Sequence, residues 1–395
     1  MMGADNHGGA RLADLRRLHS LTQSQLADLS GVPQPNLSNI EKGRAGLSHA
    51  VAIRIAQATG TPVEFFDFPS AEYDSTAIHF RRSKQVSAKG GDFVLQAFKE
   101  IERIADRLAA APVRLRQLKL PVAEQADIVS AADIEAISAD ARAASGVADD
   151  GPVRNVIRTA ERAGIAIAPL TAGSENEALL RGHCGMSRWS ADSDRSTVAY
   201  ATGMPGDRLR FTIAHELGHI LLHTRRQVGD EKQREREADL FAGSFLVPKH
   251  VAEESISETL TLHGYMRLKA KFGMAIQALI MRGRTAGLIS QQRQRSLMIQ
   301  VASRGWRTSE PVLVKCETPM LLWTQLANLY GASPYFAAGR ELGVPPSFLR
   351  QWIPERRLSN GGGATPNAPL GLIKEQMADT VVVELRSSQK QGQLK

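Results

Sequence analysis

The chain has 395 residues, 43% of them hydrophobic, and a formal net charge of +8. This length predicts two or three domains, and the hydrophobic content is high enough for buried cores, which excludes a disordered chain. The two cysteines, Cys184 and Cys316, exclude a disulfide scaffold. With no secretory leader and no apolar run near the ~20 residues of a membrane span, we expect a soluble cytoplasmic protein with no membrane contact.

Residues 10–66 predict a small helical domain. The expected helices span 10–19, 22–30, 34–42, 48–59 and 62–66. Segments 22–25 and 61–64 have the pattern of capping boxes, and Gly31 fits the turn between the second and third helices. The expected shared core consists of Leu26, Ala27, Leu37, Ile40, Val51, Ile55 and Ala56.

Segment 21–43 is similar to the Cro/C1 (Xre) helix-turn-helix family, which implies that the third helix reads double-stranded DNA. If its apolar residues face inward, its polar residues are left where such a helix meets base edges. The predicted base-contacting residues are Gln34, Asn36, Ser38 and Asn39, and the predicted phosphate-contacting residues are Gln23, Lys42 and Arg44. The alternative is a helical bundle used only for protein contacts or dimerisation.

The first 70 residues contain six Lys or Arg and six Asp or Glu, so this domain is not strongly basic by itself. We therefore expect that its affinity for DNA needs a homodimer or another basic surface. Residues 69–91 predict a polar connector in which Arg81 and Arg82 could reach phosphates, although a purely solvated connector is the favoured interpretation.

The following segment predicts helices first and strands after them. The expected helices span 93–110, 125–145 and 152–163, and the expected strands 165–169, 181–189 and 196–201. A strand at a sheet edge could pair with an extended substrate, and an ordinary α+β core explains the same strands equally well.

The sequence His215-Glu216-Leu217-Gly218-His219 predicts a metal site on a helix. Two imidazoles four residues apart lie on one helical face, and Glu216 points at the water that a bound ion would hold. Glu235 and Asp239 are again four apart, which offers a third ligand and an acceptor for the free N–H of a ligating histidine. Three protein ligands are typical of catalytic zinc. The alternative, an amphipathic helix with two chance histidines, becomes less favoured with this second motif.

Segments 210–223 and 235–248 resemble the paired motif of the ImmA/IrrE metallopeptidases, which are similar to thermolysin-type gluzincins at the metal site and typically cut transcriptional repressors. The resemblance implies that His215, His219 and Glu235 bind Zn²⁺ and that Glu216 is the general base. Glu237 is the rival third ligand, and the four-residue spacing to Asp239 favours Glu235. We expect His223, which shares the face of His219, to be a satisfied histidine and not a fourth ligand.

The sequence of the C-terminal third supports fewer predictions. Six arginines between 282 and 307 fit a solvated face, and residues 319–330 and 336–352 predict helices. Segment 340–352 resembles the core of a helix-turn-helix, and an ordinary helix pair is favoured over a second DNA reader. Residues 360–366 predict a flexible linker and 380–385 a strand, and no internal repeat or phosphate-binding glycine loop is recognisable.

The sequence therefore predicts an all-α five-helix helix-turn-helix domain at 1–68, a connector at 69–91, an α+β gluzincin-like zinc metallopeptidase domain at 92–290 and a mostly helical region of unknown role at 291–395. The predicted function is a sequence-specific DNA-binding transcriptional regulator that carries a zinc-dependent endopeptidase directed at a repressor protein. The alternative is a transcription factor whose metal domain is non-proteolytic and serves ligand or metal sensing or dimerisation.

Overall fold

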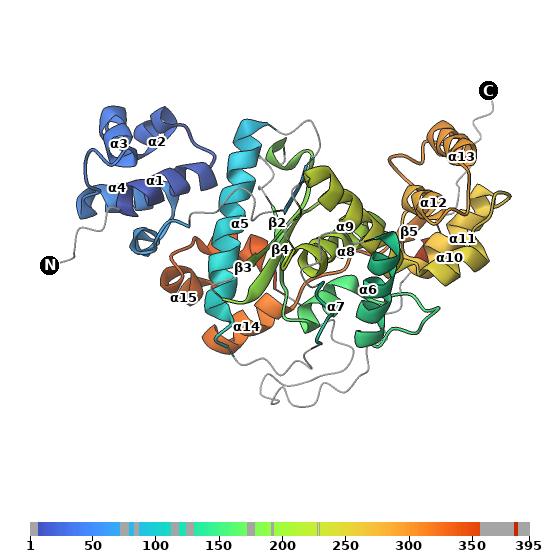
Figure 1. Cartoon of the computed structure of the whole chain (residues 1–395). Helices are drawn as coiled ribbons and strands as arrows, with labels where there is room; N and C mark the ends of the chain where they lie inside the picture. The colour runs from blue at the N-terminus through green and yellow to red at the C-terminus, as the bar shows by residue number, and fades with distance from the viewer. Residues whose placement is uncertain are drawn as a thin grey trace, which may run out of the picture. The chain divides into compact units, whose positions relative to one another are not determined.

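The computed structural model describes residues 7–71, 79–82, 87–111, 118–123, 130–171, 178–190, 193–226, 228, 230–355 and 383–385 (Figure 1). The chain divides into two compact units. Unit 1 comprises residues 1–115, 165–202 and 319–356, and unit 2 comprises residues 116–164, 203–318 and 357–395. Along the sequence, a helical N-terminal domain precedes an α+β region with a small sheet and a helical C-terminal part, which confirms the expected fold class. Within the described ranges, no helix has the length and apolarity of a bilayer span.

The N-terminal domain of unit 1 has four α-helices and a closing 3-10 turn. These elements are α1 (His7–Leu18), α2 (Gln23–Ser30), α3 (Gln34–Glu41), α4 (His49–Thr59) and η1 (Val63–Asp67). The capping box at α2 is confirmed, because the Thr22 hydroxyl accepts from the Gln25 N–H at 3.2 Å and the Gln25 side chain accepts from the Thr22 N–H at 2.9 Å. Gly31 makes the next turn with a φ of 66°.

The capping box expected at residues 61–64 is wrong. Pro62 precedes η1 and no side chain caps this element. The Thr61 hydroxyl is instead used by tertiary contacts, since it lies 2.9 Å from the His19 ring and accepts a hydrogen bond from Thr59. The expected core is buried at Leu26, Leu37, Ile40, Ile55 and Ala56, whereas Ala27 and Val51 are half-buried.

The sheet of unit 1 has the strand order β1-β3-β4-β2. The strands are β1 (His79–Arg82), β2 (Ala166–Leu170), β3 (His183–Ser190) and β4 (Arg195–Ala201). β2 and β4 are parallel, and the other neighbours are antiparallel. The long helix α5 (Ala88–Leu108) packs on β2 and β4 and buries one apolar face.

Strand β1 corrects the expectation that residues 69–91 are only a connector. Residues 79–82 pair with β3 at the sheet edge, and α5 begins at Ala88. The sequence His-Phe-Arg-Arg has no alternation of apolar and polar residues, and an edge strand needs only backbone hydrogen bonds on one side. The two edges of the sheet are thus β1 and β2, and substrate pairing at either edge stays a prediction.

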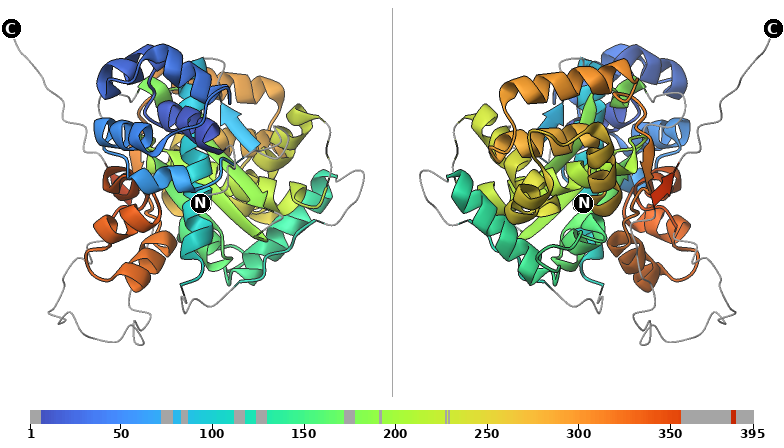
Figure 2. Two further views of the ribbon diagram at one scale, coloured as in Figure 1. Left: turned by 90° about the vertical axis from the view of Figure 1, so that its left-hand side faces the viewer. Right: turned by 90° about the vertical axis from the view of Figure 1, so that its right-hand side faces the viewer.

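Three short helices complete unit 1: α14 (Leu321–Tyr330), α15 (Pro334–Glu341) and α16 (Pro346–Trp352). They lie together in both views of Figure 2 (orange to red-brown), and α14 and α16 pack on β2. The segment 336–352 is therefore two helices separated at Gly343, whose φ is 65°. The glycine-rich segment 360–366 lies outside the described residues.

Unit 2 is built around α8 (Gly206–His223) and α9 (Glu231–Leu246), which pack against each other. Two flanking helices cover this pair: α6 (Ala131–Ala144) packs on α9, and α7 (Val156–Arg162) packs on α8. The remaining elements are α10 (Lys249–Ser255), α11 (Leu262–Phe272), α12 (Ile276–Thr285), α13 (Gln291–Ser303) and the antiparallel strands β5 (Val312–Val314) and β6 (Val383–Leu385).

Buried ions fix the first turns of α8. Lys269 of α11 is 2% exposed, and its Nζ donates to Asp207 at 2.5 Å and to Glu310 at 2.6 Å. Arg210, one turn further along α8, donates to the backbone carbonyls of Val153 and Phe272 and forms an ion pair with Glu317. Each buried charge thus has a partner, which such burial requires.

We expect Lys269→Ala to reduce the free energy of unfolding by about 3–5 kcal/mol, because it leaves two carboxylates in a buried site without their cation. Lys271→Ala on the same helix removes an exposed lysine and should change stability by less than about 0.5 kcal/mol. Urea unfolding of both variants measures the difference. Equal stability of the two variants would show that the buried ion network does not hold α8.

Candidate metal centre and nucleic-acid interface

His215 and His219 of α8 direct one ring nitrogen each toward a common point. Their Nε2 atoms are 3.0 Å apart, and both rings are buried. The Glu235 carboxylate of α9 lies against the same point, with Oε1 3.2 Å from Nε2 of His219 and Oε2 3.5 Å from Nε2 of His215. The structure thus brings the three predicted ligand residues together, with all of their ligand atoms within 4.8 Å of one another.

These separations fit a tetrahedral zinc ion. Ligand atoms bonded to zinc at about 2.0–2.1 Å with tetrahedral angles lie about 3.4 Å apart. The two nitrogens are 3.0 Å apart, and each lies 3.2 or 3.5 Å from one of the two Glu235 oxygens, which is close to this value. Two imidazoles and one carboxylate are also a donor set that zinc commonly takes.

The other ring nitrogens are occupied in a way that leaves Nε2 available. The His215 Nδ1 lies 2.8 Å from the Asp239 carboxylate, which can only accept, so the proton sits on Nδ1. The His219 Nδ1 lies 3.0 Å from the His223 Nδ1, and the His223 Nε2 lies 3.1 Å from the Glu237 carboxylate. The same reasoning puts the His223 proton on Nε2 and leaves its Nδ1 to accept from His219. Both ligand histidines therefore present an Nε2 lone pair.

The local electrostatics agree with these protonation states. Burial, with a smaller contribution from His219, lowers the pKa of His223 to about 4, so this ring is neutral at pH 7. Burial raises the pKa of Glu235, but its contacts with the rings of His215 and His219 outweigh burial and hold that pKa well below its usual range. Glu235 is therefore a carboxylate at neutral pH.

Glu237, the rival third ligand, lies away from the ligand nitrogens. Its carboxylate accepts from Arg226 at 3.0 Å and from Gln233 at 2.8 Å, in addition to its contact with His223. Residues two apart on a helix point in different directions, so Glu235 and Glu237 cannot serve the same site. Sequence reasoning missed Arg226, because it lies in the segment after α8 while its partner Glu237 lies on α9, and no helical spacing connects them.

Gly218 allows the two helices of the site to approach closely. A Cβ at this position would lie 3.1 Å from the Phe241 ring and 3.2 Å from the backbone of Ala238. A side chain at position 218 would therefore crowd the part of α9 that carries Ala238 and its neighbour Asp239. Glu216 is fully buried beside His215 and is not one of the converging ligands, and its role as the general base stays a prediction.

The predicted DNA-reading residues line α3 and its end. Asn36, Asn39, Lys42 and Arg44 are exposed, whereas Gln34 and Ser38 are half-buried. Gln34, predicted to contact a base, and Gln23, predicted to contact a phosphate, lie together. The Gln34 side-chain amide donates a hydrogen bond to the Gln23 side chain at 2.8 Å.

Glu41 continues this chain of hydrogen bonds. It accepts from Gln23 at 2.9 Å and forms an ion pair with Arg16 at 2.7 Å. Burial raises the pKa of Glu41, but the hydrogen bond from Arg16 contributes most to a net lowering. The carboxylate is thus charged, and it orients Gln23 at the start of α2 and, through Gln23, Gln34 at the start of α3.

Family comparisons find one match for each of the two regions that carry the candidate sites. Residues 12–66 match the helix-turn-helix family model. Residues 160–283 match the IrrE N-terminal-like domain of the M78 peptidases. The chain joins a helix-turn-helix domain to an IrrE-like domain. The first match covers all of the predicted DNA-contacting residues, and the second covers His215, Glu216, His219, Glu235 and Asp239. No match was found among curated proteins.

These matches give the coarse biochemical class of each part. The helix-turn-helix domain is that of a DNA-binding regulator of the Xre type, as expected from segment 21–43. The IrrE-like domain is peptidase-like and has a possible metal-binding triad, in a family of zinc metallopeptidases.

We expect Asp239→Ala to weaken zinc binding by about 10–100-fold, because the variant no longer fixes the proton on Nδ1 of His215. Arg236→Ala removes an exposed side chain from the same helix and should leave zinc affinity unchanged. Competition with a zinc chelator measures both affinities. An unchanged affinity in Asp239→Ala would show that the carboxylate does not orient the ligand.

Proposed function

We propose that this protein is a sequence-specific DNA-binding regulator whose IrrE-like domain is a zinc-dependent endopeptidase that cleaves a regulatory protein. One observation carries the proposal: two imidazole nitrogens and a carboxylate meet at separations of 3.0–3.5 Å on two packed helices. His215, His219 and Glu235 would hold the metal. When bound, zinc would polarise a carbonyl and lower the pKa of a water molecule.

Glu216 is the residue that distinguishes a hydrolytic metal site from a purely structural one. It follows His215 directly on α8, and a carboxylate there can take a proton from the attacking water and deliver it to the leaving amine. A structural or sensing metal site needs no such base. The presence of Glu216 beside a complete ligand set therefore favours peptide hydrolysis over the non-proteolytic alternative.

We expect the purified chain to bind about one zinc per molecule and His219→Ala to lose it, because two ligands hold zinc much more weakly than three. Glu216→Gln should keep the metal and lose hydrolysis, since it removes the base and no ligand. Metal analysis, together with cleavage assays on helix-turn-helix repressor proteins, measures both effects.

His263→Ala, an exposed histidine of α11, is the matched control and should keep both zinc and cleavage. Full zinc occupancy in His219→Ala would overturn the ligand assignment. Cleavage by Glu216→Gln at the wild-type rate would overturn its role as the base. A zinc-loaded wild type that cleaves no repressor would favour the sensing or dimerising alternative.

DNA recognition is assigned to α3 because its exposed amides suit base edges. Asn36 and Asn39 are exposed on one turn of α3, and an amide can bond an adenine edge with both a donor and an acceptor. Lys42 and Arg44, just beyond the helix, suit phosphates.

We expect Asn39→Ala to weaken binding to an operator by about 1–3 kcal/mol and to leave binding to random DNA unchanged, because only base contacts carry sequence information. Lys42→Ala should weaken both by a similar factor, since phosphate contacts are independent of sequence. Titration with an operator selected from a random library provides the measurement. If the chain acts as a homodimer, footprinting should show two protected half-sites about one helical turn apart. Equal losses on operator and random DNA in Asn39→Ala would argue against base reading.

A further inference from the structure

The turn between α15 and α16 repeats the turn between α2 and α3. The sequence Gly31-Val32-Pro33 recurs 312 residues later as Gly343-Val344-Pro345. The two glycines have φ angles of 66° and 65°. The two prolines each precede the first residue of the following helix, with φ, ψ of −55°, 134° and −51°, 134°.

The same correspondence extends through the second helix of each pair. In the first pair, Pro33 O accepts from the N–H groups of residues 36 and 37 at 2.9 and 3.2 Å, and Pro345 O accepts from those of residues 348 and 349 at 3.0 and 3.2 Å. Buried residues coincide at this spacing. The matched pairs are Leu26 and Ala338, Val32 and Val344, Leu37 and Leu349, and Ile40 and Trp352, all at most 4% exposed.

A further helix precedes each pair, α1 in the first case and α14 in the second. The α15–α16 pair and its turn therefore repeat the local geometry of the α2–α3 pair, whereas α14 packs on α15 and α1 packs on α3. The pair was not recognisable as a repeat in the sequence, because few side chains are shared outside the turn.

The helix that would read DNA in this pair uses its side chains for packing. Phe348 stands where α3 has Asn36. The centroid of its ring lies 5.1 Å from that of Trp352, with an angle of 6° between the two ring planes, and 5.3 Å from that of His19. Gln351 stands where α3 has Asn39, and it accepts a hydrogen bond from Thr171 at 2.9 Å. The two amide positions that suit base reading in α3 are thus occupied by protein contacts in α16.

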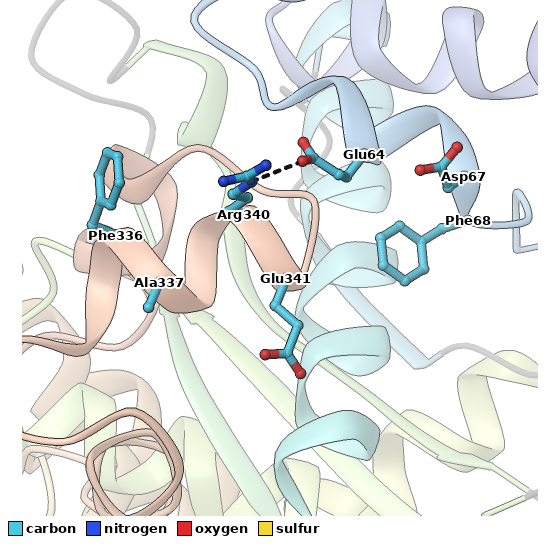
Figure 3. Close-up of a pocket in the computed structure, with 7 residues that line it drawn as sticks. All are labelled: Glu64, Asp67, Phe68, Phe336, Ala337, Arg340 and Glu341. Atoms are coloured by element: carbon cyan, nitrogen blue, oxygen red, sulfur yellow. Dashed lines mark hydrogen bonds and ion pairs between the residues drawn. The ribbon is translucent and has the colours of Figure 1, made fainter.

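The α15–α16 pair contacts the N-terminal domain at η1 and, through Phe348, at His19 after the end of α1. The Arg340 Nε donates to Glu64 at 3.1 Å, and the two side chains face each other in Figure 3. A Cβ on Gly343 would lie 2.7 Å from the Phe68 ring and 3.0 Å from the Phe65 backbone. The turn therefore packs closely against η1 and the residue that follows it. The Arg340 pair borders a pocket of about 640 Å³, so both side chains can be exchanged without disturbing a packed core.

We propose that the α15–α16 pair (residues 334–352) is a second helix-turn-helix unit that has exchanged DNA reading for protein binding. Through α16 and the α15–α16 turn it binds η1 and the end of α1 in the same chain, and α3 alone reads DNA. The part that concerns α3 rests on the proposed DNA-binding function, whereas the intramolecular contact does not.

Hydrogen exchange of the amides of η1 and of the end of α1 in the full chain tests the contact without DNA. Phe348→Ala should speed exchange roughly two- to tenfold, because it removes the aromatic contact with His19. R340E should speed it roughly two- to fivefold by placing two carboxylates together, and the double variant E64R/R340E should restore the wild-type rate. Ser347 is exposed on α16, the helix of Phe348, and Ser347→Ala should leave the exchange rates unchanged. Wild-type exchange in both Phe348→Ala and R340E, or no recovery in the double variant, would overturn the proposal.

Operator binding tests whether α16 has a DNA-reading role. Arg350 is exposed on α16 at the position of Ser38, and Arg350→Ala should keep operator affinity within about twofold. Asn39→Ala should lose roughly tenfold or more with the same duplex, selected from a random library with the wild-type chain. An equal loss in Arg350→Ala would make α16 a second DNA reader and overturn the proposal. If neither variant loses affinity, the DNA-reading role of α3 fails, and the exchange measurements still decide the intramolecular contact.

Discussion

The close packing of α8 on α9 is the constraint on which the metal centre depends. Gly218 permits this approach, because even a methyl group there would meet Phe241 and the Ala238 backbone at 3.1–3.2 Å. Close packing brings the Glu235 carboxylate to the two imidazoles of α8, and it brings Asp239 within 2.8 Å of Nδ1 of His215. A wider spacing would leave two histidines with no third ligand and no fixed tautomer. The glycine inside the metal motif thus has a physical role of its own.

Polar groups behind the ligands extend this constraint into the protein. His219 is backed by His223, then by Glu237, and Glu237 is held by Arg226. Burial keeps the pKa of His223 near 4, so this ring is neutral and forms a hydrogen-bonded link between His219 and the Glu237 carboxylate. Helix α3, which is proposed to read DNA, has a similar support, since a charged Glu41 orients Gln23 of α2 and Gln23 orients Gln34 at the start of α3. In both domains residues proposed to act are thus held by a chain of hydrogen bonds that ends outside the proposed contact residues.

Local spacing explains what the sequence could predict. Four-residue spacing on a helix places both histidines, and Glu235 with Asp239, on common faces before any tertiary contact is known. Glu235 could be favoured over Glu237 on this ground, but two partners of Glu237, His223 and Arg226, lie outside α9 and could not be read from local spacing. Strand β1 was missed because its residues lack alternation and its pairing is tertiary. The sequence of segment 340–352 did resemble a helix-turn-helix core, but its correspondence to the N-terminal domain was missed, because few side chains are shared outside the Gly-Val-Pro turn.

The central claim is that two histidines and one glutamate hold zinc. X-ray absorption at the zinc edge on the metal-loaded wild-type chain tests it most directly. The account predicts two imidazole nitrogens together with oxygen ligands at about 2.0–2.1 Å and no sulfur. A sulfur scatterer at about 2.3 Å, from Cys184 or Cys316, would contradict the account, and so would a spectrum with fewer than two imidazoles.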